Sequence, residues 1–242
     1  MKIINKLLFF TLFTPTLMFA QSANDNEIRI DQTGDTLTLT IDQIGYGNKI
    51  CGTISSGTCA SDMVITGTTN NINFDQIGNL NQIYGPMILD QSTISINMTG
   101  SSNIWDQTIG ASGSADSSNL LATWQGSSNT INLDWGAAQS AERLDFDLDV
   151  TGSSNVFTTV IEVDDARYDV DVTGSSNDVN TSMTDGAYHK IDLELVQSSG
   201  NIDIIQSSGT CPTGISSCFS SIIAEFDSEN ATITINQKDT SD

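Results

Sequence analysis

Basic residues, prolines and histidines are scarce in this sequence, and the shortages of basic residues and of histidine bear on function. Eight Lys and Arg residues stand against 30 Asp and Glu residues, so the formal net charge at pH 7 is −22. A surface this acidic repels phosphate groups, so we expect no binding to nucleic acid and no attraction to anionic membranes. The one histidine, His189, stands beside Tyr188 and Lys190 without a Ser-His-Asp triad pattern, and we expect it at the surface.

A long apolar run occurs only at the beginning of the chain, within residues 1–20. Two lysines precede an apolar stretch that ends at Ala20, which is the pattern of a secretory signal peptide cleaved after Ala20 or, as the second choice, after Ala23. A membrane anchor is the alternative, but the stretch contains a proline and falls short of the about 20 apolar residues that span a bilayer. We therefore expect residues 21–242 to form one secreted domain without membrane insertion.

The four cysteines occur as two close pairs, Cys51 with Cys59 and Cys211 with Cys218. Each pair encloses a stretch rich in Gly, Ser and Thr, so in an exported chain we predict two disulfides that close loop insertions near 51–59 and 211–218. Zinc is the alternative, but the spacing is wider than Cys-x-x-Cys and the chain has one histidine. We predict no metal site and no cofactor.

A five-residue motif, Thr-Gly-Ser-Ser-Asn, recurs through the middle of the chain. It occurs at 99–103, 151–155 and 173–177, and with Gln in place of Thr at 125–129. The shorter pattern Gly-x-x-Asn adds Gly45 to Asn48, Gly67 to Asn70 and Gly78 to Asn81. The glycines 45, 67, 78 and 100 are separated by 22, 11 and 22 residues, and the next steps are 26, 26 and 22. A turn that returns on an 11/22 grid indicates a repeat architecture.

The residues around each motif predict turns that connect β-strands. Gly adopts positive φ without steric cost, and Asn tolerates the left-handed region. Apolar and polar residues alternate before the turns, as in Leu37–Ile41, Ile94–Met98 and Phe146–Val150. We predict an all-β fold, a β-solenoid of stacked strand-turn-strand rungs of about 22 residues, in which each rung buries its apolar face against its neighbours. Disorder is the alternative for so acidic a chain, but a disordered chain would not keep this alternation.

Chemistry-bearing patterns are weak, and we predict that the chain is not an enzyme. The carboxylates of Asp145, Asp147 and Asp149 alternate with apolar residues and therefore mark the solvated face of a strand. Stacked acidic strands bring like charges together, which should raise the pKa values of these carboxyl groups. Three tryptophans, Trp105, Trp124 and Trp135, are expected to cap or fill the interior, with sugar stacking on an exposed ring as the alternative.

One stretch resembles a known repeat family. Gln43-Ile44-Gly45-Tyr46-Gly47-Asn48 is similar to the Gln-x-Gly-x-Gly-Asn core of the curlin repeat, and residues 76–81 are a looser copy. The resemblance implies that Gln43 and Asn48 are ladder residues and that Gly45 and Gly47 make the turn. With the repeats of the Gly-x-x-Asn pattern, the predicted ladder and turn residues are Gln43, Gly45, Gly47, Asn48, Gln76, Gly78, Asn81, Gly100, Asn103, Gly126, Asn129, Gly152, Asn155, Gly174 and Asn177.

Curlins are the subunits of curli, the amyloid fibres of the bacterial biofilm matrix. The resemblance therefore implies a secreted structural subunit at the bacterial cell surface that serves adhesion and aggregation. Its implied partners are copies of itself, other curli-type subunits and a secretion pore. Later repeats carry Met98, Trp124, Val150 or Val172 where the curlin motif has Gln, so the chain resembles a divergent member, such as a minor or nucleating subunit.

Assembly is expected to proceed through the two ends of the solenoid. Both terminal segments, Ile28–Ile30 and Ile233–Ile235, alternate like strands, and we expect them to pair between copies because a terminal strand exposes unpaired N–H and C=O groups. An ice-binding solenoid is the alternative, indicated by the Thr-x-Thr rows within 36–40 and 232–234. A glycan-binding surface adhesin is a further alternative.

Overall fold

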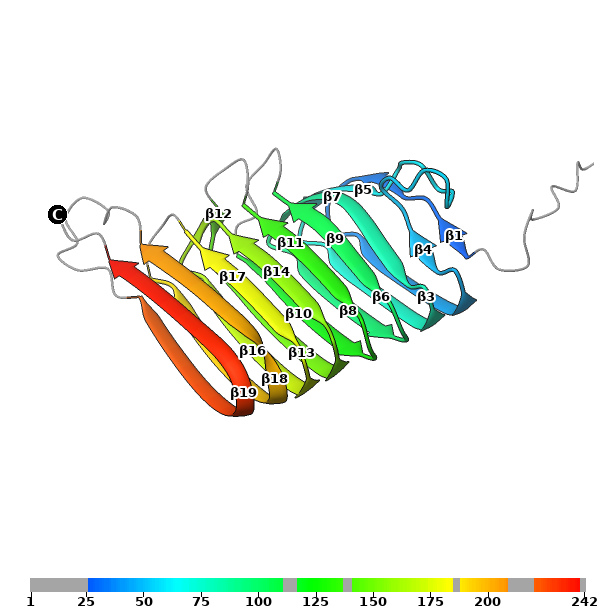
Figure 1. Cartoon of the computed structure of the whole chain (residues 1–242). Coiled ribbons are helices and arrows are strands. Elements are labelled where there is room, and N and C mark those ends of the chain that lie inside the picture. The colour runs from blue at the N-terminus through cyan, green and yellow to red at the C-terminus, as the bar shows by residue number, and fades with distance from the viewer. Residues whose placement is uncertain (1–25, 111–116, 137–140, 185–187, 209–219, 240–242) are drawn as a thin grey trace, which may run out of the picture.

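The computed structural model describes residues 26–110, 117–136, 141–184, 188–208 and 220–239. Within these ranges the regular structure consists of β-strands that pair in parallel and wind into a β-solenoid (Figure 1), which confirms the predicted fold class. The described ranges contain no helix that is long and apolar enough to cross a membrane. The predicted signal peptide and the pair Cys211 and Cys218 lie outside the described residues.

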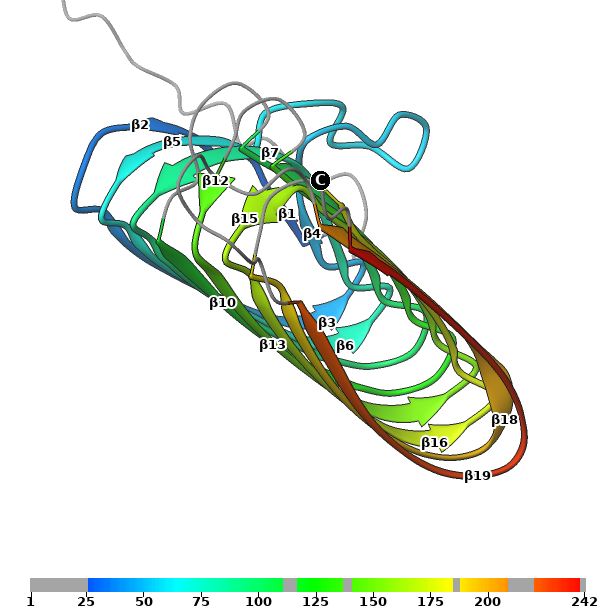
Figure 2. The same cartoon turned by 90° about the vertical axis from the view of Figure 1, so that its left-hand side faces the viewer.

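Two long walls form the solenoid, and they meet in a tight curve at one edge (Figure 2). The stack of strands that contains β3 is called the first wall. It consists of β3 (Thr38–Tyr46), β6 (Asn71–Asn79), β8 (Thr93–Thr99), β10 (Ser118–Gln125), β13 (Leu144–Ser153), β16 (Arg167–Ser175) and the first halves of β18 (Lys190–Ser208) and β19 (Ser221–Asp239).

The second wall follows the curve in each turn of the solenoid. It consists of β1 (Glu27–Ile28), β4 (Lys49–Ile50), the start of β7 (Gln82–Asp90), β9 (Ile104–Ile109), β11 (Thr130–Trp135), β14 (Val156–Ile161), β17 (Asp178–Met183) and the second halves of β18 and β19. Short strands line the opposite edge, namely β2 (Asp31–Thr33), β5 (Val64–Thr68) with the end of β7, and the separate pair β12 (Ala141–Glu142) and β15 (Val163–Asp164).

The strand register corrects the predicted 11/22 grid. Gly45 is the partner of Gly78, so the first step of the wall is 33 residues rather than 22. Gly67 belongs to the opposite edge, where it lies against Gly34 and pairs with Leu89. The first step is longer because the loop after β4, which contains the Cys51 to Cys59 segment, is inserted into that turn. The predicted 22-residue rung therefore holds only for part of the stack, such as the pairing of Gly152 with Gly174.

The tight curve is built on a column of stacked glycines. A Cβ atom added to Gly100, Gly126, Gly152 or Gly174 would overlap with the carbonyl oxygen of the glycine in the preceding turn. These glycines also have φ values between 145° and 155°, which L side chains rarely adopt. Glycine is therefore required at this curve by close backbone approach as well as by conformation.

The second serine of each motif, rather than the asparagine, adopts the left-handed conformation. Ser102, Ser128, Ser154 and Ser176 have φ values between 56° and 63°, and Gly47 takes the same place in the first turn with φ 64°. Asparagine tolerates this conformation, but in these turns the residue before it adopts it. The asparagine follows one residue later with its side chain fully buried, so its amide is placed inside the solenoid.

Inward-facing side chains of the two walls form one continuous core. As predicted, Trp105, Trp124 and Trp135 are all fully buried, and the rings of Trp105 and Trp124 stack with centroids 5.3 Å apart. Phe146 and Tyr168, partners in neighbouring strands, stack at 4.8 Å. Like-on-like aromatic stacking of this kind stabilises parallel register.

His189 is buried, with 1% of its surface exposed, so the prediction that it lies at the surface is wrong. It directly precedes β18, whose first residue, Lys190, pairs with Arg167. The register then puts His189 beside the position of Ala166, which is also buried. Buried positions at this edge therefore hold side chains as different as Ala and His. The alternation of apolar and polar residues does not predict a buried histidine.

We predict that Gly152→Ala strongly destabilises the solenoid because the new Cβ would meet the Gly126 carbonyl. The expected loss in the free energy of unfolding is about 1–3 kcal/mol or more, measured by urea denaturation followed by circular dichroism. Gly34→Ala is the matched control, since Gly34 has the same φ of 150° but no atom closer than 3.8 Å to the added Cβ. An equal loss in both variants would contradict the role of close approach and leave only the strained φ.

Candidate functional site

Buried asparagines connect successive turns at the tight curve. The backbone N–H of Asn103 donates to the side-chain oxygen of Asn129 at 3.1 Å, Asn129 donates to Asn155 at 3.0 Å, and Asn155 donates to Asn177 at 3.1 Å. Asn177 continues the column by donating to Oε1 of Gln197 at 3.1 Å. Each side chain thereby satisfies a backbone group that the curve leaves without a partner in the strand ladder.

A glutamine ladder joins the first two turns of the first wall. Nε2 of Gln76 donates to Oε1 of Gln43 at 2.7 Å, and Nε2 of Gln43 donates to the carbonyl of Lys49 at 3.1 Å. The predicted partners Asn48 and Asn81 are fully buried and donate to the carbonyls of Gln43 and Gln76. The structure thus brings together the residues that carry the curlin resemblance. Further along, the column continues with the apolar residues Met98, Trp124, Val150 and Val172.

A second glutamine ladder, which the sequence did not reveal, lies at the other end of the solenoid. Nε2 of Gln237 donates to Oε1 of Gln206 at 2.9 Å and to the carbonyl of Ser220 at 2.8 Å. The two residues are 31 positions apart, and no other pair of described strands has this separation between partners. In both strands the inward-facing residues end in Gln, and this similarity could have indicated the ladder. No repeated spacing in the sequence connects the two glutamines.

Cys51 and Cys59 form a disulfide, and both are buried. The closed loop lies against β1 and the residue that follows it, Arg29. The backbone N–H of Cys59 donates to Oε1 of Glu27 at 3.3 Å, and its carbonyl accepts a hydrogen bond from Arg29. The disulfide therefore fixes a loop that holds the N-terminal strand segment.

Carboxylates stack along the outer face of the first wall. The partners in successive turns are Asp147, Asp169 and Asp192 in one row, and Asp149, Asp171 and Glu194 in the next. Partial burial raises the pKa of Asp147 above 3.8; Asp149 and Asp169 raise it further, while Arg167 lowers it. Burial likewise raises the pKa of Asp171, with contributions from Asp149, Asp169 and Glu194. These shifts have the predicted direction. Among the described residues, no group of three His, Cys, Asp or Glu side chains is arranged to hold a metal ion.

The last turn leaves the core open at the C-terminal end. Ile222, Ala224 and Phe226 of β19 face inward but are only partly buried, and Ile233 and Ile235 are 39% and 43% exposed. Their partners one turn earlier are buried; Ile191 and Ile202, for example, are each 1% exposed. Within the described part of the chain β19 pairs only with β18, so its outer backbone edge is available as well.

The N-terminal end is open in the same way on the first wall. Leu37, Leu39 and Ile41 are only partly buried, whereas Ile72 and Phe74, the partners of Leu39 and Ile41 in β6, are fully buried. β3 has β6 as its one strand partner among the described residues. The solenoid therefore presents an unpaired strand and an uncovered apolar core at both ends, which is the surface that strand-to-strand association uses.

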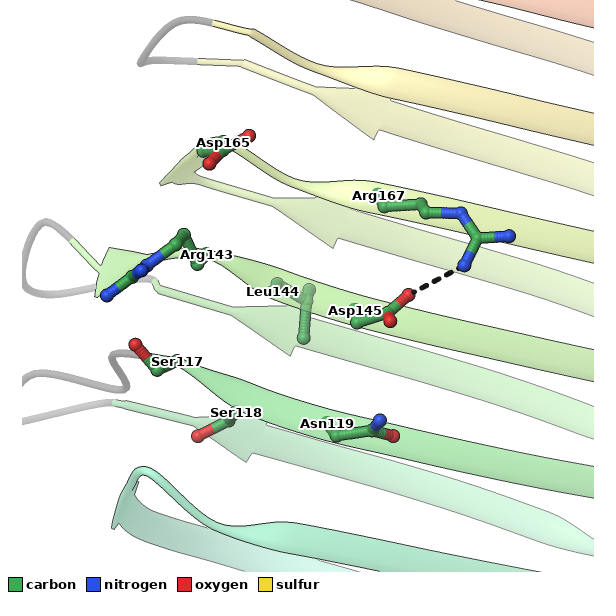
Figure 3. Close-up of a pocket in the computed structure, with 8 residues that line it drawn as sticks. All are labelled: Ser117, Ser118, Asn119, Arg143, Leu144, Asp145, Asp165 and Arg167. Carbon is green, nitrogen blue, oxygen red and sulfur yellow. Dashed lines mark hydrogen bonds and ion pairs between the residues drawn. The ribbon is translucent and has the colours of Figure 1, made fainter.

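A shallow groove of about 390 Å³ lies along the edge between β10 and β16 (Figure 3). Its lining residues are Ser117, Ser118, Asn119, Arg143, Leu144, Asp145, Asp165 and Arg167. Figure 3 shows that Arg143 and Arg167 point in different directions, and Arg167 forms an ion pair with Asp145 at 3.3 Å. The polar groups do not converge on one point, and the lining includes no histidine to activate its serines.

Comparisons of this chain with protein-family models, with curated proteins and with solved structures found no match.

We predict that Asn155→Ala destabilises the solenoid because it removes the side chain that accepts the backbone N–H of Asn129 inside the core. The expected loss is about 1–3 kcal/mol, the cost of leaving a buried donor unsatisfied. Asn132→Ala is the control, since Asn132 lies on the exposed face of β11. Equal urea midpoints for the two variants would show that the asparagine column contributes no stability.

Stability should rise on mild acidification because the pKa values of Asp147 and Asp171 are raised in the fold. A carboxyl group with a raised folded pKa contributes stability that is fully present below its unfolded pKa and is lost as the pH rises through the folded value. The double variant Asp147→Asn with Asp171→Asn should therefore be more stable than the wild type at pH 7, by about 0.2–1 kcal/mol for each relieved like-charge pair. The two proteins should converge near pH 3.

The matched control is Asp106→Asn, whose strand partners Tyr84 and Asn132 carry no carboxylate. Thermal unfolding at several pH values measures both variants. A wild-type stability that does not change between pH 3 and pH 7 would contradict the stacked register of the acidic rows.

Proposed function

We propose that this protein is a secreted structural subunit that assembles end to end into a curli-like amyloid fibre. The fibre would belong to the extracellular matrix of a bacterial biofilm, where it would serve adhesion and aggregation, with this chain in a minor or nucleating role beside other curli-type subunits. The observation that carries the proposal is the open core at both ends of the solenoid, with an unpaired strand over each opening.

Continuing the first-wall register across a junction supports this proposal. The column that contains Leu39 runs through the wall to Ile222, and the column that contains Ile41 runs to Ala224. A second copy stacked in the same register would lay its Leu39 on Ile222 and its Ile41 on Ala224. Apolar side chains would then cover apolar side chains, and each buried methylene contributes about 0.8 kcal/mol. The strand spacing inside the subunit would continue through the fibre, as in cross-β structure.

The rows of threonine that indicated ice binding do not form an array. Thr38 and Thr40 stack on Asn71 and Asn73. At the other end, Thr232 and Thr234 stack on Asn201 and Asp203. An ice-binding face needs the same side chain in successive turns, and the tryptophans that could have stacked on sugars are buried. No specific observation therefore favours the ice-binding or the glycan-binding alternative.

We predict that Phe226→Lys prevents fibre growth while leaving the monomer folded. Phe226 is partly exposed in the last turn, so a lysine there keeps its charge in water in the monomer. The column that contains Phe226 begins at Gln43, so at a junction the same charge would be buried against Gln43 of the next copy, where one amide cannot replace its hydration. Negative-stain microscopy and thioflavin fluorescence of the purified mature chain measure fibre growth, and circular dichroism monitors the fold.

Ile223→Lys is the matched control, because it makes the same charge change three positions earlier in the same strand. Ile223 faces outward with 53% of its surface exposed, and its strand partner is Asp192. The control should grow fibres at nearly the wild-type rate. If the wild type remains monomeric for days at high concentration, or if both lysine variants grow equally well, end-to-end assembly through this surface is excluded.

A further inference from the structure

The two walls of the solenoid do not contain the same number of strands. In the described part of the chain the first wall is formed by β3, β6, β8, β10, β13, β16, β18 and β19. The second wall contains a strand for each of these turns, together with β1, which pairs in parallel with the outer edge of β4. The second wall therefore extends one strand further at the N-terminal end.

This extra strand conflicts with seamless end-to-end stacking. At the C-terminal end β19 is the last strand of both walls among the described residues, so the next copy must add one strand to each wall. If that copy lays its β3 on β19, its β1 occupies the same place as the second half of β19. If its β1 lies on the second half of β19 instead, the first wall lacks one strand. The inward residues of β3 and β19 would then stay apart by about two strand spacings of 4.8 Å.

A small set of contacts holds β1 in place. The backbone N–H groups of Lys49 and Cys51 donate to the carbonyls of Asn26 and Ile28 at 2.9 and 3.0 Å. Nζ of Lys49 forms an ion pair with Glu27 at 3.3 Å. The same ammonium group donates to the carbonyl of Gly57 at 2.6 Å, which ties this contact to the disulfide loop.

The disulfide loop adds further contacts. The backbone of Cys59 forms hydrogen bonds with the side chains of both Glu27 and Arg29. Arg29 also forms an ion pair with Asp62 at 3.7 Å. Since β1 is two residues long, it has few contacts to lose.

We propose that β1 is a removable strap that occupies the docking site of a second copy, and that the second half of β19 from that copy displaces it during assembly. This inference rests on the proposed end-to-end assembly and specifies its interface. Following the second wall, the column that contains Ile28 and Ile50 ends at Ile233. Ile233 of the incoming copy therefore takes the place of Ile28 beside Ile50.

The two segments are similar in pattern, which fits exchange at one site. Ile28-Arg29-Ile30 and Ile233-Thr234-Ile235 both alternate isoleucine with a polar residue. The incoming strand is much longer than the strap, since β19 extends from Ser221 to Asp239. It also covers the first wall with Ile222 and Ala224, so displacement replaces a short pairing by one that spans both walls. The expected pairing of 28–30 with 233–235 between copies thus becomes competition of the two segments for β4.

The first test loosens the strap with Glu27→Ala and Arg29→Ala together. Elongation from sonicated wild-type seeds should become about tenfold faster, because less free energy is needed to detach β1. A tenfold change corresponds to a detachment free energy that is about 1.4 kcal/mol lower. The matched control is Asp145→Ala with Arg167→Ala, which removes one acid and one base from an exposed ion pair on the first wall. Hydrogen exchange at the amides of Lys49 and Cys51 in the monomer should rise in the loosened variant alone.

The second test locks the strap with Ile28→Cys and Ile50→Cys, which are partners in the strand register. Peptide mapping must show that the two introduced cysteines are joined and that Cys51 remains bonded to Cys59. The locked monomer should not elongate seeds. The control is Ile28→Val with Ile50→Val, which also shortens both side chains but forms no bond and should elongate them.

The outcomes separate this inference from the proposed function. Fibre growth by the locked variant at the wild-type rate would overturn the strap and favour stacking with β1 in place, while end-to-end assembly would still hold. Equal elongation by the loosened variant and its control would also overturn the strap. Absence of growth in every variant, including the wild type and the loosened variant, would overturn the proposed function and the strap with it.

Discussion

The close approach of backbones at the tight curve is the constraint on which the solenoid depends. At this curve the glycine of each turn lies directly against the carbonyl group of the glycine before it, from Gly78 to Gly174. No Cβ atom fits there, so only glycine lets successive turns approach to the roughly 4.8 Å spacing of paired strands. The buried asparagine three residues later, as in Asn103 and Asn129, then bonds the backbone that the curve leaves unpaired. The motif combines a residue that permits the curve with one that satisfies its hydrogen bonds.

The sequence allowed the fold class and the middle of the stack to be predicted because the motif is spaced there by one turn of the chain. Gly152 and Gly174 are partners, as their spacing indicated. The prediction failed for Gly67, since the same Gly-x-x-Asn pattern also serves the opposite edge of the solenoid. A four-residue pattern specifies a tight turn, but not the edge of the solenoid at which the turn lies.

The proposed assembly surface was harder to predict than the ladder, because an open end is defined by the strands that are missing beside it. Gln206 and Gln237 pair across a step that no other turn repeats, so spacing could not identify them. The apolar residues of β19 look in the sequence like those of any inner strand. Only the stacking order shows that Ile222 and Phe226 have no following turn above them in the described chain. The position of a strand in the stack decides whether its apolar face is core or interface.

Charge and apolar surface are distributed so that association along the axis is favoured over association side by side. Asp147, Asp169 and Asp192 line the outer face of the first wall, and the whole chain carries a net charge of −22. Two such faces repel each other at short range, and salt weakens that repulsion beyond about 10 Å at 0.1 M. The ends of the solenoid instead expose partly buried apolar residues and strand edges. In the proposed assembly, repulsion between two acidic first walls would oppose lateral pairing of subunits through those faces.

The two ends are chemically different, which gives such a fibre a direction. At the N-terminal end Glu27 of β1 pairs with Lys49 of β4 and accepts a hydrogen bond from Cys59 of the disulfide loop. The C-terminal end presents β19 with its edge exposed along both walls. A disulfide persists in an oxidising compartment and is rare in the cytosol, so export would fix the loop that holds β1. In the proposed fibre, the C-terminal end would be open along both walls, whereas at the N-terminal end β1 would cover the second wall and leave the first wall open. Growth would depend on the meeting of two folded ends rather than on unfolding of the chain.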